Sequence, residues 1–333
     1  MLRVHCTEQD LLRVSIAEHP LPLLELSVAL CMLQRSDTHP AFGPWRSRTR
    51  RDLPQAARPL LQLLSPLGAG PMFLDPSTTT AAEGMDLVRS TPAAAARAEL
   101  QRICAIDRPA TPWVRRLAEQ DREAWQILDR ALRTAYTYLL ADSWSRIQAG
   151  FDAEAAWRAR ILVQQGLSAV LTSLSPAIRL RGTTLEADCP RDLELTLTGT
   201  GIVLQPSLFW TGHPLASWHD DGRLLLIYPA VTPLPLLAAP TADDPLSALL
   251  GATRARTLRL LSTQHTTTDL ARELTITTAA ASIQAKTLRE AGLITSRRDG
   301  KAVWHWCTPL GLDLTAAGGR GRRDTPLGGA DRS

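Results

Sequence analysis

The sequence of 333 residues predicts an α+β chain: a large, mostly helical N-terminal domain with a small antiparallel sheet, followed by a compact basic module. Apolar residues recur at helical spacing through the first part, whereas apolar and polar residues alternate between Ile178 and Tyr228. Positive charge then collects near the C-terminus. Residues 245–310 contain nine Arg and Lys against four Asp and Glu, while residues 1–243 contain 24 against 25.

The helices of the first part are predicted from their apolar periodicity. Leu21–Gln34 is almost wholly apolar, which is typical of a buried helix. Longer helical patterns cover Trp113–Ala149 and Ala153–Leu174. These three segments account for most of the helix expected before residue 175.

The strands are predicted from alternation and from turn residues. Leucines alternate with polar residues in Leu193–Thr198, as in a half-buried strand. Gly199–Gly201 and Asp220–Gly222 are turn sequences that each precede an apolar run. We therefore expect a small antiparallel sheet joined by short turns.

A proline-rich stretch marks the seam between two domains. Prolines and small residues replace periodic structure over Pro229–Pro245. We expect an N-terminal α+β domain at 1–230, a linker at 231–244, a basic module at 245–310 and a disordered tail, rich in Gly, Arg and Asp, at 311–333.

Cysteine usage and hydropathy predict a cytoplasmic protein without a membrane partner. The cysteines are odd in number and scattered, with no C-x-x-C pair: Cys6, Cys31, Cys104, Cys189 and Cys307. The N-terminus lacks the apolar core of a signal peptide. The longest apolar run, Leu21–Leu33, is shorter than the roughly 20 residues that span a bilayer.

The basic module begins with two predicted helices. Pro245 suits the first turn of a helix that runs through Ser262. Thr266 and Asp269 then have the spacing of a capping box, which opens a short second helix.

A tight turn leads into a third helix. Thr275–Thr277 is a three-residue turn, and Thr277 can cap a helix that runs to Ala291. Gly292 then occupies the left-handed C′ position. Two short helices joined by three residues make a helix-turn-helix.

The helix after the turn divides into two faces. Ala281, Ala285 and Leu288 recur at i, i+4 and i+7 and are predicted to point inward. The opposite side can enter a DNA major groove. The residues that we predict to contact DNA from this helix are Thr277, Thr278, Ala279, Ser282, Ile283, Gln284 and Lys286.

A cationic hairpin follows. Leu293–Ser296 and Ala302–Cys307 are predicted strands, and Asp299-Gly300 supplies the positive φ angles of a hairpin turn. This hairpin is the wing of a winged helix-turn-helix, and its cations would displace counterions from phosphates. The predicted phosphate contacts are Arg297, Arg298 and Lys301. Trp304 and Trp306 share one side of the second strand. They would pack against the first helix of the module or against the large domain, or they would form a dimer interface.

The module resembles the DNA-binding domain of ArsR-type (arsenic-repressor-like) winged-helix transcriptional regulators. The matching stretches are TTTDLAREL, TAAASIQAKTLREAGLI and SRRDGKAVWHW, about a fifth of the chain. The segment AFGPWRSR also resembles the N-terminal half of some two-domain members. The resemblance implies a homodimer on double-stranded DNA.

Thr275 and Gln284 depart from the family pattern, which often has Gly and His there. The helix before the turn lacks the cysteines of metal-sensing members, so we expect neither metal nor cofactor.

Three other features have competing interpretations. The arginine-rich segment Trp45–Asp52 is either a solvated loop or an anion contact. Trp125, Trp144 and Trp157 either fill the core or line an effector pocket. The stretch SWHDDGR contains turn residues rather than a catalytic motif, and no other histidine falls in one, so we do not expect an enzyme.

We therefore expect a transcriptional regulator, a repressor in its simplest form, that binds operator DNA as a homodimer. The N-terminal domain would set the dimer geometry, sense a small-molecule effector, or both; no motif identifies effector-binding residues. The alternative hypothesis is a non-enzymatic interaction protein whose winged helix contacts another protein.

Overall fold

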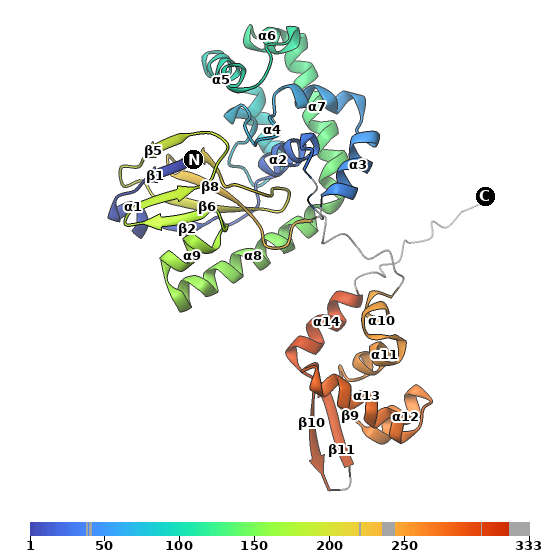
Figure 1. Ribbon diagram of the computed structural model, residues 1–333. Coiled ribbons are helices and arrows are strands. Elements are labelled where there is room, and N and C mark those ends of the chain that lie inside the picture. The colour runs from blue at the N-terminus through green and yellow to red at the C-terminus, as the bar shows by residue number, and fades with distance from the viewer. Residues whose placement is uncertain (38, 40–41, 220, 235–243, 301, 320–333) are drawn as a thin grey trace, which may run out of the picture. The chain divides into compact units, whose positions relative to one another are not determined.

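The computed structural model describes residues 1–37, 39, 42–219, 221–234, 244–300 and 302–319 (Figure 1). The chain divides into two compact units, Met1–Ala238 and Ala239–Ser333, and this division falls within the predicted linker. Both units combine helices with sheets, which confirms the α+β class. None of the described helices is both long enough and apolar enough to cross a membrane.

Helices form most of the first 175 residues of the N-terminal unit. The α-helices are α1 (Glu8–Leu12), α2 (Pro22–Gln34), α3 (Gly43–Asp52), α4 (Ala81–Arg89), α5 (Ala93–Ile106), α6 (Pro112–Ala118), α7 (Arg122–Leu139), α8 (Trp144–Gln165) and α9 (Leu167–Ser173). Three 3₁₀ helices connect them: η1 (Gln55–Gln62), η2 (Met72–Leu74) and η3 (Ala141–Ser143).

The buried helix predicted for Leu21–Gln34 is confirmed as α2. The helical segments predicted for Trp113–Ala149 and Ala153–Leu174 are each divided into shorter helices. Gln120 has a φ of 60°, and the carboxylate of Asp121 then accepts a hydrogen bond from the Ala124 N–H, which starts α7 as a new helix. Gly166, with a φ of 84°, separates α8 from α9. A left-handed residue ends the i→i−4 hydrogen bonding of a helix, although the apolar periodicity continues through it.

The described residues of the N-terminal unit form two four-stranded sheets, with the strand orders β3-β4-β1-β5 and β2-β6-β8-β7. The strands are β1 (Leu2–His5), β2 (Val14–Ile16), β3 (Ile178–Arg181), β4 (Thr184–Ala187), β5 (Leu193–Thr196), β6 (Ile202–Ser207), β7 (Leu215–Trp218) and β8 (Leu224–Pro229). Both sheets are mixed, because the β1–β5, β2–β6 and β6–β8 pairs are parallel. The prediction of one small antiparallel sheet is therefore wrong.

Gly201 and Gly222 explain why the observed sheets differ from the predicted antiparallel sheet. Gly201 has a φ of 100°, and a Cβ there would lie 2.6 Å from the Arg13 carbonyl oxygen, so only glycine permits this close approach. The chain crosses here from one sheet to the other, whereas the sequence pattern suggested a hairpin. Only the second predicted turn, with Gly222 at a φ of 81°, joins antiparallel neighbours, β7 and β8.

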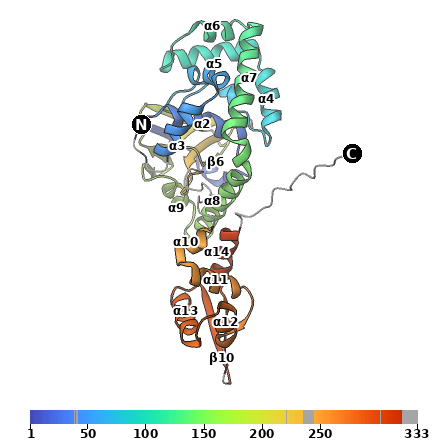
Figure 2. The ribbon, with the colours of Figure 1, turned by 90° about the vertical axis from the view of Figure 1, so that its right-hand side faces the viewer.

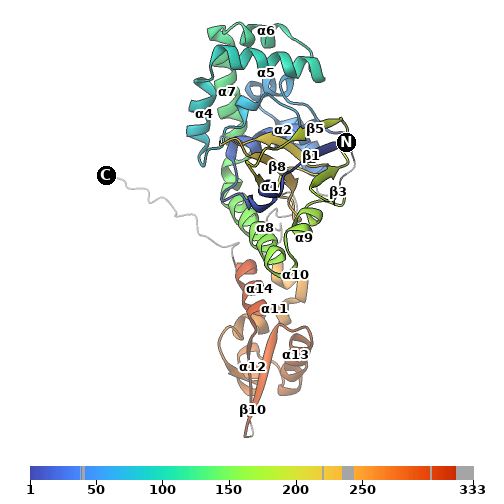
Figure 3. The same ribbon diagram turned by 90° about the vertical axis from the view of Figure 1, so that its left-hand side faces the viewer.

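The sheet that contains β6 and β8 is buried on both faces. One face contributes Val203, Leu225 and Ile227 to a core shared with helices such as α2 and α7. The other face packs against the β1–β4 sheet and against α8 and α9. Figure 3 shows α4–α7 on one side of the sheets and α8–α9 on another. Burial on two faces accounts for the apolar sequence of β8 and for the burial of every residue of β6.

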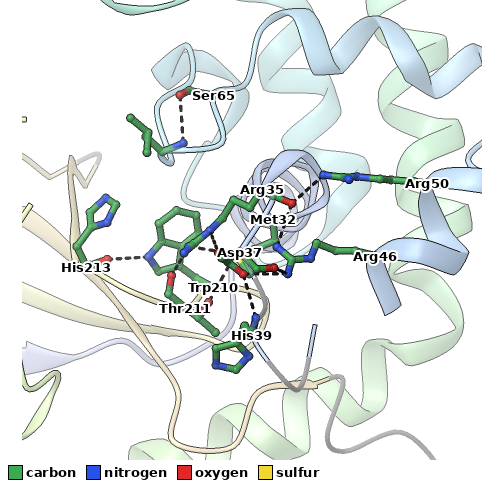
Figure 4. A network of polar contacts seen from close by, with 11 residues as sticks. Met32, Arg35, Asp37, His39, Arg46, Arg50, Ser65, Trp210, Thr211 and His213 are labelled. Atoms are coloured by element: carbon green, nitrogen blue, oxygen red, sulfur yellow. Dashed lines mark hydrogen bonds and ion pairs between the residues drawn. The ribbon is translucent and has the colours of Figure 1, made fainter. Parts of the chain in front are cut away.

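The arginine-rich segment Trp45–Asp52 lies within helix α3 rather than in a loop. The Arg46 guanidinium is buried and donates to the Arg35 carbonyl oxygen at 3.1 Å and to the Asp37 carboxylate at 2.9 Å (Figure 4). Arg50 donates to the Leu33 and Arg35 carbonyl oxygens. These arginines thus satisfy carbonyl groups at the C-terminal end of α2, which is a structural role.

Arg35 continues this network into the loop after β6. Its guanidinium donates to the Thr211 carbonyl oxygen at 2.6 Å and lies 5.4 Å from the centre of the Trp210 ring (Figure 4). The Trp210 indole N–H in turn donates to the His213 carbonyl oxygen at 2.7 Å. The network therefore fixes the end of α2 to the sheet.

In its described part, the C-terminal unit has one core and one antiparallel sheet. Its elements are α10 (Pro245–Leu250), α11 (Ala252–Leu260), β9 (His265–Thr266), α12 (Thr267–Leu274), α13 (Thr278–Glu290), β10 (Ile294–Asp299), β11 (Ala302–Cys307) and α14 (Pro309–Gly319). The sheet order is β10-β11-β9. Leucines and alanines of the helices, with Ile294 and Cys307 of the hairpin, form the core.

Two boundaries of this unit differ from the prediction. The helix expected from Pro245 to Ser262 is broken by Gly251, whose φ is 83°. The tail expected to be disordered from residue 311 is helical to Gly319: the Thr308 hydroxyl accepts a hydrogen bond from the Gly311 N–H, and a Cβ at Gly311 would overlap the Leu293 carbonyl oxygen. Residues 320–333 lie outside the described part.

One buried ion pair generates a stability prediction for the N-terminal unit. Arg158 of α8 is 1% exposed, donates to Glu154 at 2.7 Å and to the Ser173 carbonyl oxygen at 2.8 Å, and so joins α8 to α9. We expect Arg158→Met to lower the free energy of unfolding by about 3–5 kcal/mol, because Glu154 would keep a buried, unpaired charge. The double variant Glu154→Gln/Arg158→Met should recover most of that loss. Urea unfolding measures both, and a loss under about 1 kcal/mol would match an exposed pair instead.

Candidate nucleic-acid interface

The turn between α12 and α13 is fixed by caps on both helices. The Thr266 hydroxyl accepts a hydrogen bond from the Asp269 N–H at 3.1 Å, and the Asp269 carboxylate accepts one from the Thr266 N–H at 3.2 Å, which confirms the predicted capping box. Thr275 adopts the left-handed conformation, with a φ of 57°. Glycine adopts this conformation more easily than threonine does. The Ile276 N–H then donates to the Ala271 carbonyl oxygen.

Helix α13 begins and ends where the sequence predicts. The Thr277 hydroxyl accepts a hydrogen bond from the Ala280 N–H at 3.1 Å. At the other end Gly292 has a φ of 73°, and the Leu293 N–H donates to the Leu288 carbonyl oxygen at 2.9 Å. These contacts form a Schellman motif, which stops the helix before the hairpin.

The two faces of α13 are also as predicted. Ala281, Ala285 and Leu288 are buried in the core of the unit. Most of the predicted DNA contacts are exposed: Thr277, Thr278, Ala279, Ser282, Ile283 and Lys286. Gln284 is half-buried. Ile283 is 61% exposed, and it is not among the described residues that form or contact the core of the unit.

The hairpin of β10 and β11 extends past α12 and α13 (Figure 2). Asp299 pairs with Ala302, so the strand ladder continues through Asp299. The prediction of Asp299-Gly300 as the turn is wrong by one residue: Gly300 has a φ of 58°, but Asp299 belongs to the strand ladder. Lys301, a predicted phosphate contact, lies outside the described residues.

Arg297 and Arg298 are both exposed on β10, and they point to opposite faces of the hairpin because neighbouring strand residues alternate. Arg298 lies opposite Val303, on the face that carries the buried His305. Arg297 lies opposite Trp304. The hairpin therefore presents a cation on each of its faces.

His305 connects the hairpin to the helices. Its side chain is buried, with Nε2 2.9 Å from the Thr267 hydroxyl of α12 and Nδ1 2.7 Å from the Ser296 hydroxyl of β10. Burial, with a smaller effect from the positive charge of Arg289, lowers the pKa of His305 below its ordinary value. The neutral imidazole thus holds the hairpin in a fixed position relative to α12. No sequence motif indicated this role.

An open groove of about 570 Å³ lies between α13, the start of α12 and the hairpin. Its lining residues carry hydroxyl and methyl groups and, among those described, no carboxylate: Thr266, Thr267, Thr268, Thr278, Ala279, Ser282, Ala302 and Val303. Such a surface can donate and accept hydrogen bonds and contact methyl groups without repelling an anion. It brings together Thr278, Ala279 and Ser282 of the predicted contacts.

The two tryptophans of β11 lie on the other side of the hairpin. Trp304 and Trp306 are half-buried, and they are not among the residues that form or contact the core of the C-terminal unit. Trp125 and Trp144 of the N-terminal unit pack against its core, and Trp157 is 42% exposed. In the described part of the chain, no three His, Cys, Asp or Glu side chains are grouped to hold a metal ion.

Comparison with known proteins covers only the N-terminal unit. Residues 74–233 match the model of a family of unknown function, DUF5937. No curated protein and no solved structure matches the chain significantly. The match ends before α10, so it does not include the helices and the hairpin of the C-terminal unit.

The lowered pKa of His305 predicts a pH-dependent stability of the C-terminal unit. Below the ordinary histidine pKa of about 6.5 the unfolded chain binds a proton more readily than the folded chain, so stability is complete above that pH and is lost as the pH falls. We expect the protection factors of the α12 and hairpin amides, in which the observed exchange rate is divided into the intrinsic rate at the same pH, to fall between about pH 7 and pH 5.5, above the range where carboxylates titrate. In the non-titrating variant His305→Gln this fall should be smaller. If the parent chain and His305→Gln show the same change with pH, protonation of His305 is not coupled to folding.

Proposed function

We propose that the protein is a DNA-binding transcriptional regulator of the ArsR type, with a winged helix-turn-helix formed by α10–α14. The observation that supports this proposal best is the exposed face of α13 beside the exposed arginines of the hairpin, across an open groove free of carboxylates. The concentration of positive charge in residues 245–310 agrees with it. The cytoplasm is the compartment in which such a protein would act.

In this proposal α13 enters the major groove and the hairpin follows the phosphate backbone. Thr278, Ser282 and Lys286 offer donors and acceptors of modest reach, and Ile283 can contact thymine methyl groups. The predicted contact residues of this face include no Arg or Asn, the side chains that form bidentate contacts with bases. Affinity would therefore come mainly from phosphate contacts by Arg297 and Arg298, and specificity from DNA shape and methyl contacts.

The proposal includes a homodimer, because one helix and one hairpin cover a short stretch of DNA and a two-fold dimer can occupy two half-sites one helical turn apart. The C-terminal unit has apolar side chains available for such a contact. Leu249 of α10 is 69% exposed, and Leu310 and Leu312 of α14 are 58% and 45% exposed. Helices α10 and α14, which carry these leucines, contact each other within the unit. Occupation of an operator by the dimer would repress transcription by exclusion.

A second candidate function is protein binding by the same module. The half-buried Trp304 and Trp306 are the residues that favour it, because exposed aromatic surface is typical of protein interfaces. The two functions differ in their dependence on salt, since only contacts with a polyanion release condensed counterions.

Removal of the hairpin cations should weaken DNA binding irrespective of sequence. We expect Arg297→Ala/Arg298→Ala to reduce affinity for random-sequence duplex DNA and to lower the slope of log affinity against log salt by about 2 for each bound chain. Fluorescence anisotropy at several salt concentrations measures both quantities. The control is Arg48→Ala/Arg160→Ala, which removes two exposed arginines of the N-terminal unit. Salt-independent binding, or equal losses in the two variants, would contradict the proposed role.

Charges placed on the exposed leucines should separate the dimer. We expect Leu249→Glu/Leu310→Glu to shift the full chain from dimer to monomer in sedimentation equilibrium and to weaken binding to a two-half-site duplex. Leu12→Glu, at an exposed leucine of the N-terminal unit, is the matched control. A parent chain that binds DNA while it remains monomeric would refute the dimer.

A further inference from the structure

The N-terminal unit encloses a cavity of about 320 Å³ between α2, the η2 segment, the loop before it and the sheet that contains β7 and β8. We call it the Asp75 cavity. Its walls are mainly apolar, with Leu24 and Val28 of α2 facing Leu215 of β7 and Ile227 of β8. A mostly apolar cavity with a few converging polar groups is the usual form of a small-molecule site, and this volume lies at the lower end of the range for such sites.

One carboxyl group inside the cavity lacks a charge partner. The Asp75 side chain follows η2 and lines the cavity, where its Oδ1 accepts a hydrogen bond of 2.5 Å from the buried Ser27 hydroxyl. Among the described residues no Arg, Lys or His forms an ion pair with Asp75, and its Oδ2 has no hydrogen-bond donor. Arg102, at the cavity edge, is occupied instead by Glu99 at 2.8 Å and by the Gly70 carbonyl oxygen.

The surroundings of Asp75 do not compensate its charge. Burial raises the pKa of Asp75 to about 7, and only the Ser27 hydrogen bond opposes this effect. Burial also raises the pKa of Cys31 and lowers that of His213, so both remain neutral near pH 7. The other charged or titratable groups around the cavity are Arg102, Cys189, Arg191 and Asp192. The charge of Asp192 is already matched by the N-terminal ammonium group at 2.8 Å.

We propose that the Asp75 cavity binds a small organic amine, with its ammonium group on Asp75 and Ser27 and its apolar part between α2 and the β7–β8 strands. The unpaired carboxylate oxygen supplies the one strong acceptor that an ammonium group requires, and the apolar walls exclude strongly hydrated cations. An anion beside the Asp75 carboxylate would place two like charges close together. This inference rests on the N-terminal unit alone and does not depend on the DNA-binding proposal.

The amines 2-phenylethylamine and tryptamine are suitable probes, with the alcohols 2-phenylethanol and tryptophol and the anion phenylacetate for comparison. We expect at least one of the amines to bind the full chain with a Kd below about 1 mM, a reasonable affinity for a ligand of this size. Its alcohol should bind at least about tenfold more weakly, and phenylacetate should not bind. Isothermal titration calorimetry measures all five.

The dependence on pH identifies the group that receives the amine. Because an ammonium group favours the ionised carboxylate, affinity should rise about tenfold from pH 6 to pH 8, and binding at pH 6.5 should release a proton, seen as a dependence of the heat on the buffer. This proton release is measured on the unaltered protein. The neutral alcohols should show neither effect.

Asp75→Asn, which keeps the shape of the side chain, should weaken amine binding at least about tenfold at pH 8 and abolish the proton release. Asp152→Asn removes an exposed carboxylate of α8 and should leave both unchanged. The proposal is overturned if neither amine binds, if the alcohols bind as tightly as the amines, or if Asp75→Asn binds amines like the parent chain. Loss of DNA binding in any of these proteins would not affect this result.

Discussion

The position of the cationic hairpin depends on the hydrogen bonds of one buried side chain, His305. Ser296 belongs to the neighbouring strand and Thr267 to α12, and the imidazole connects both. The backbone ladder between β11 and β9, in which Trp304 pairs with Thr266, and the core residues Ile294 and Cys307 at the base of the hairpin act together with this connection. The groove beside α13 has a defined width because the connection lies halfway along the hairpin, between the core and the arginines.

The inward face of α13 has small side chains, which also help to place this helix beside the hairpin. Ala281 and Ala285 let the helix approach the core closely, so its other side stays at the surface beside the hairpin. The N-terminal unit is organised differently. Its central strands are buried on two faces, and Arg46, Arg158 and the buried Glu25 form hydrogen bonds with backbone groups of the unit. Asp75 differs from these residues, because its second oxygen faces a cavity.

The sequence predicted the C-terminal unit well because local signals specify it. Capping residues, a left-handed glycine and alternation in the hairpin act within a few residues, and they located α12, α13 and both strands. The sheets of the N-terminal unit depend on contacts such as β1 with β5, about 190 residues apart, and no local pattern distinguishes a parallel from an antiparallel partner there. The roles of Asp75 and His305 were also hidden, since both depend on distant neighbours.

The most direct test of the DNA-binding account is a map of the protein surface that DNA covers. Hydrogen exchange of the full chain, with and without a saturating duplex, reports on each segment separately. The account predicts protection at the turn before α13, along the exposed half of that helix and at the hairpin tip, with the core of the N-terminal unit unchanged. Protection confined to the N-terminal unit, or none at α13 and the hairpin under conditions where DNA is bound, would contradict it.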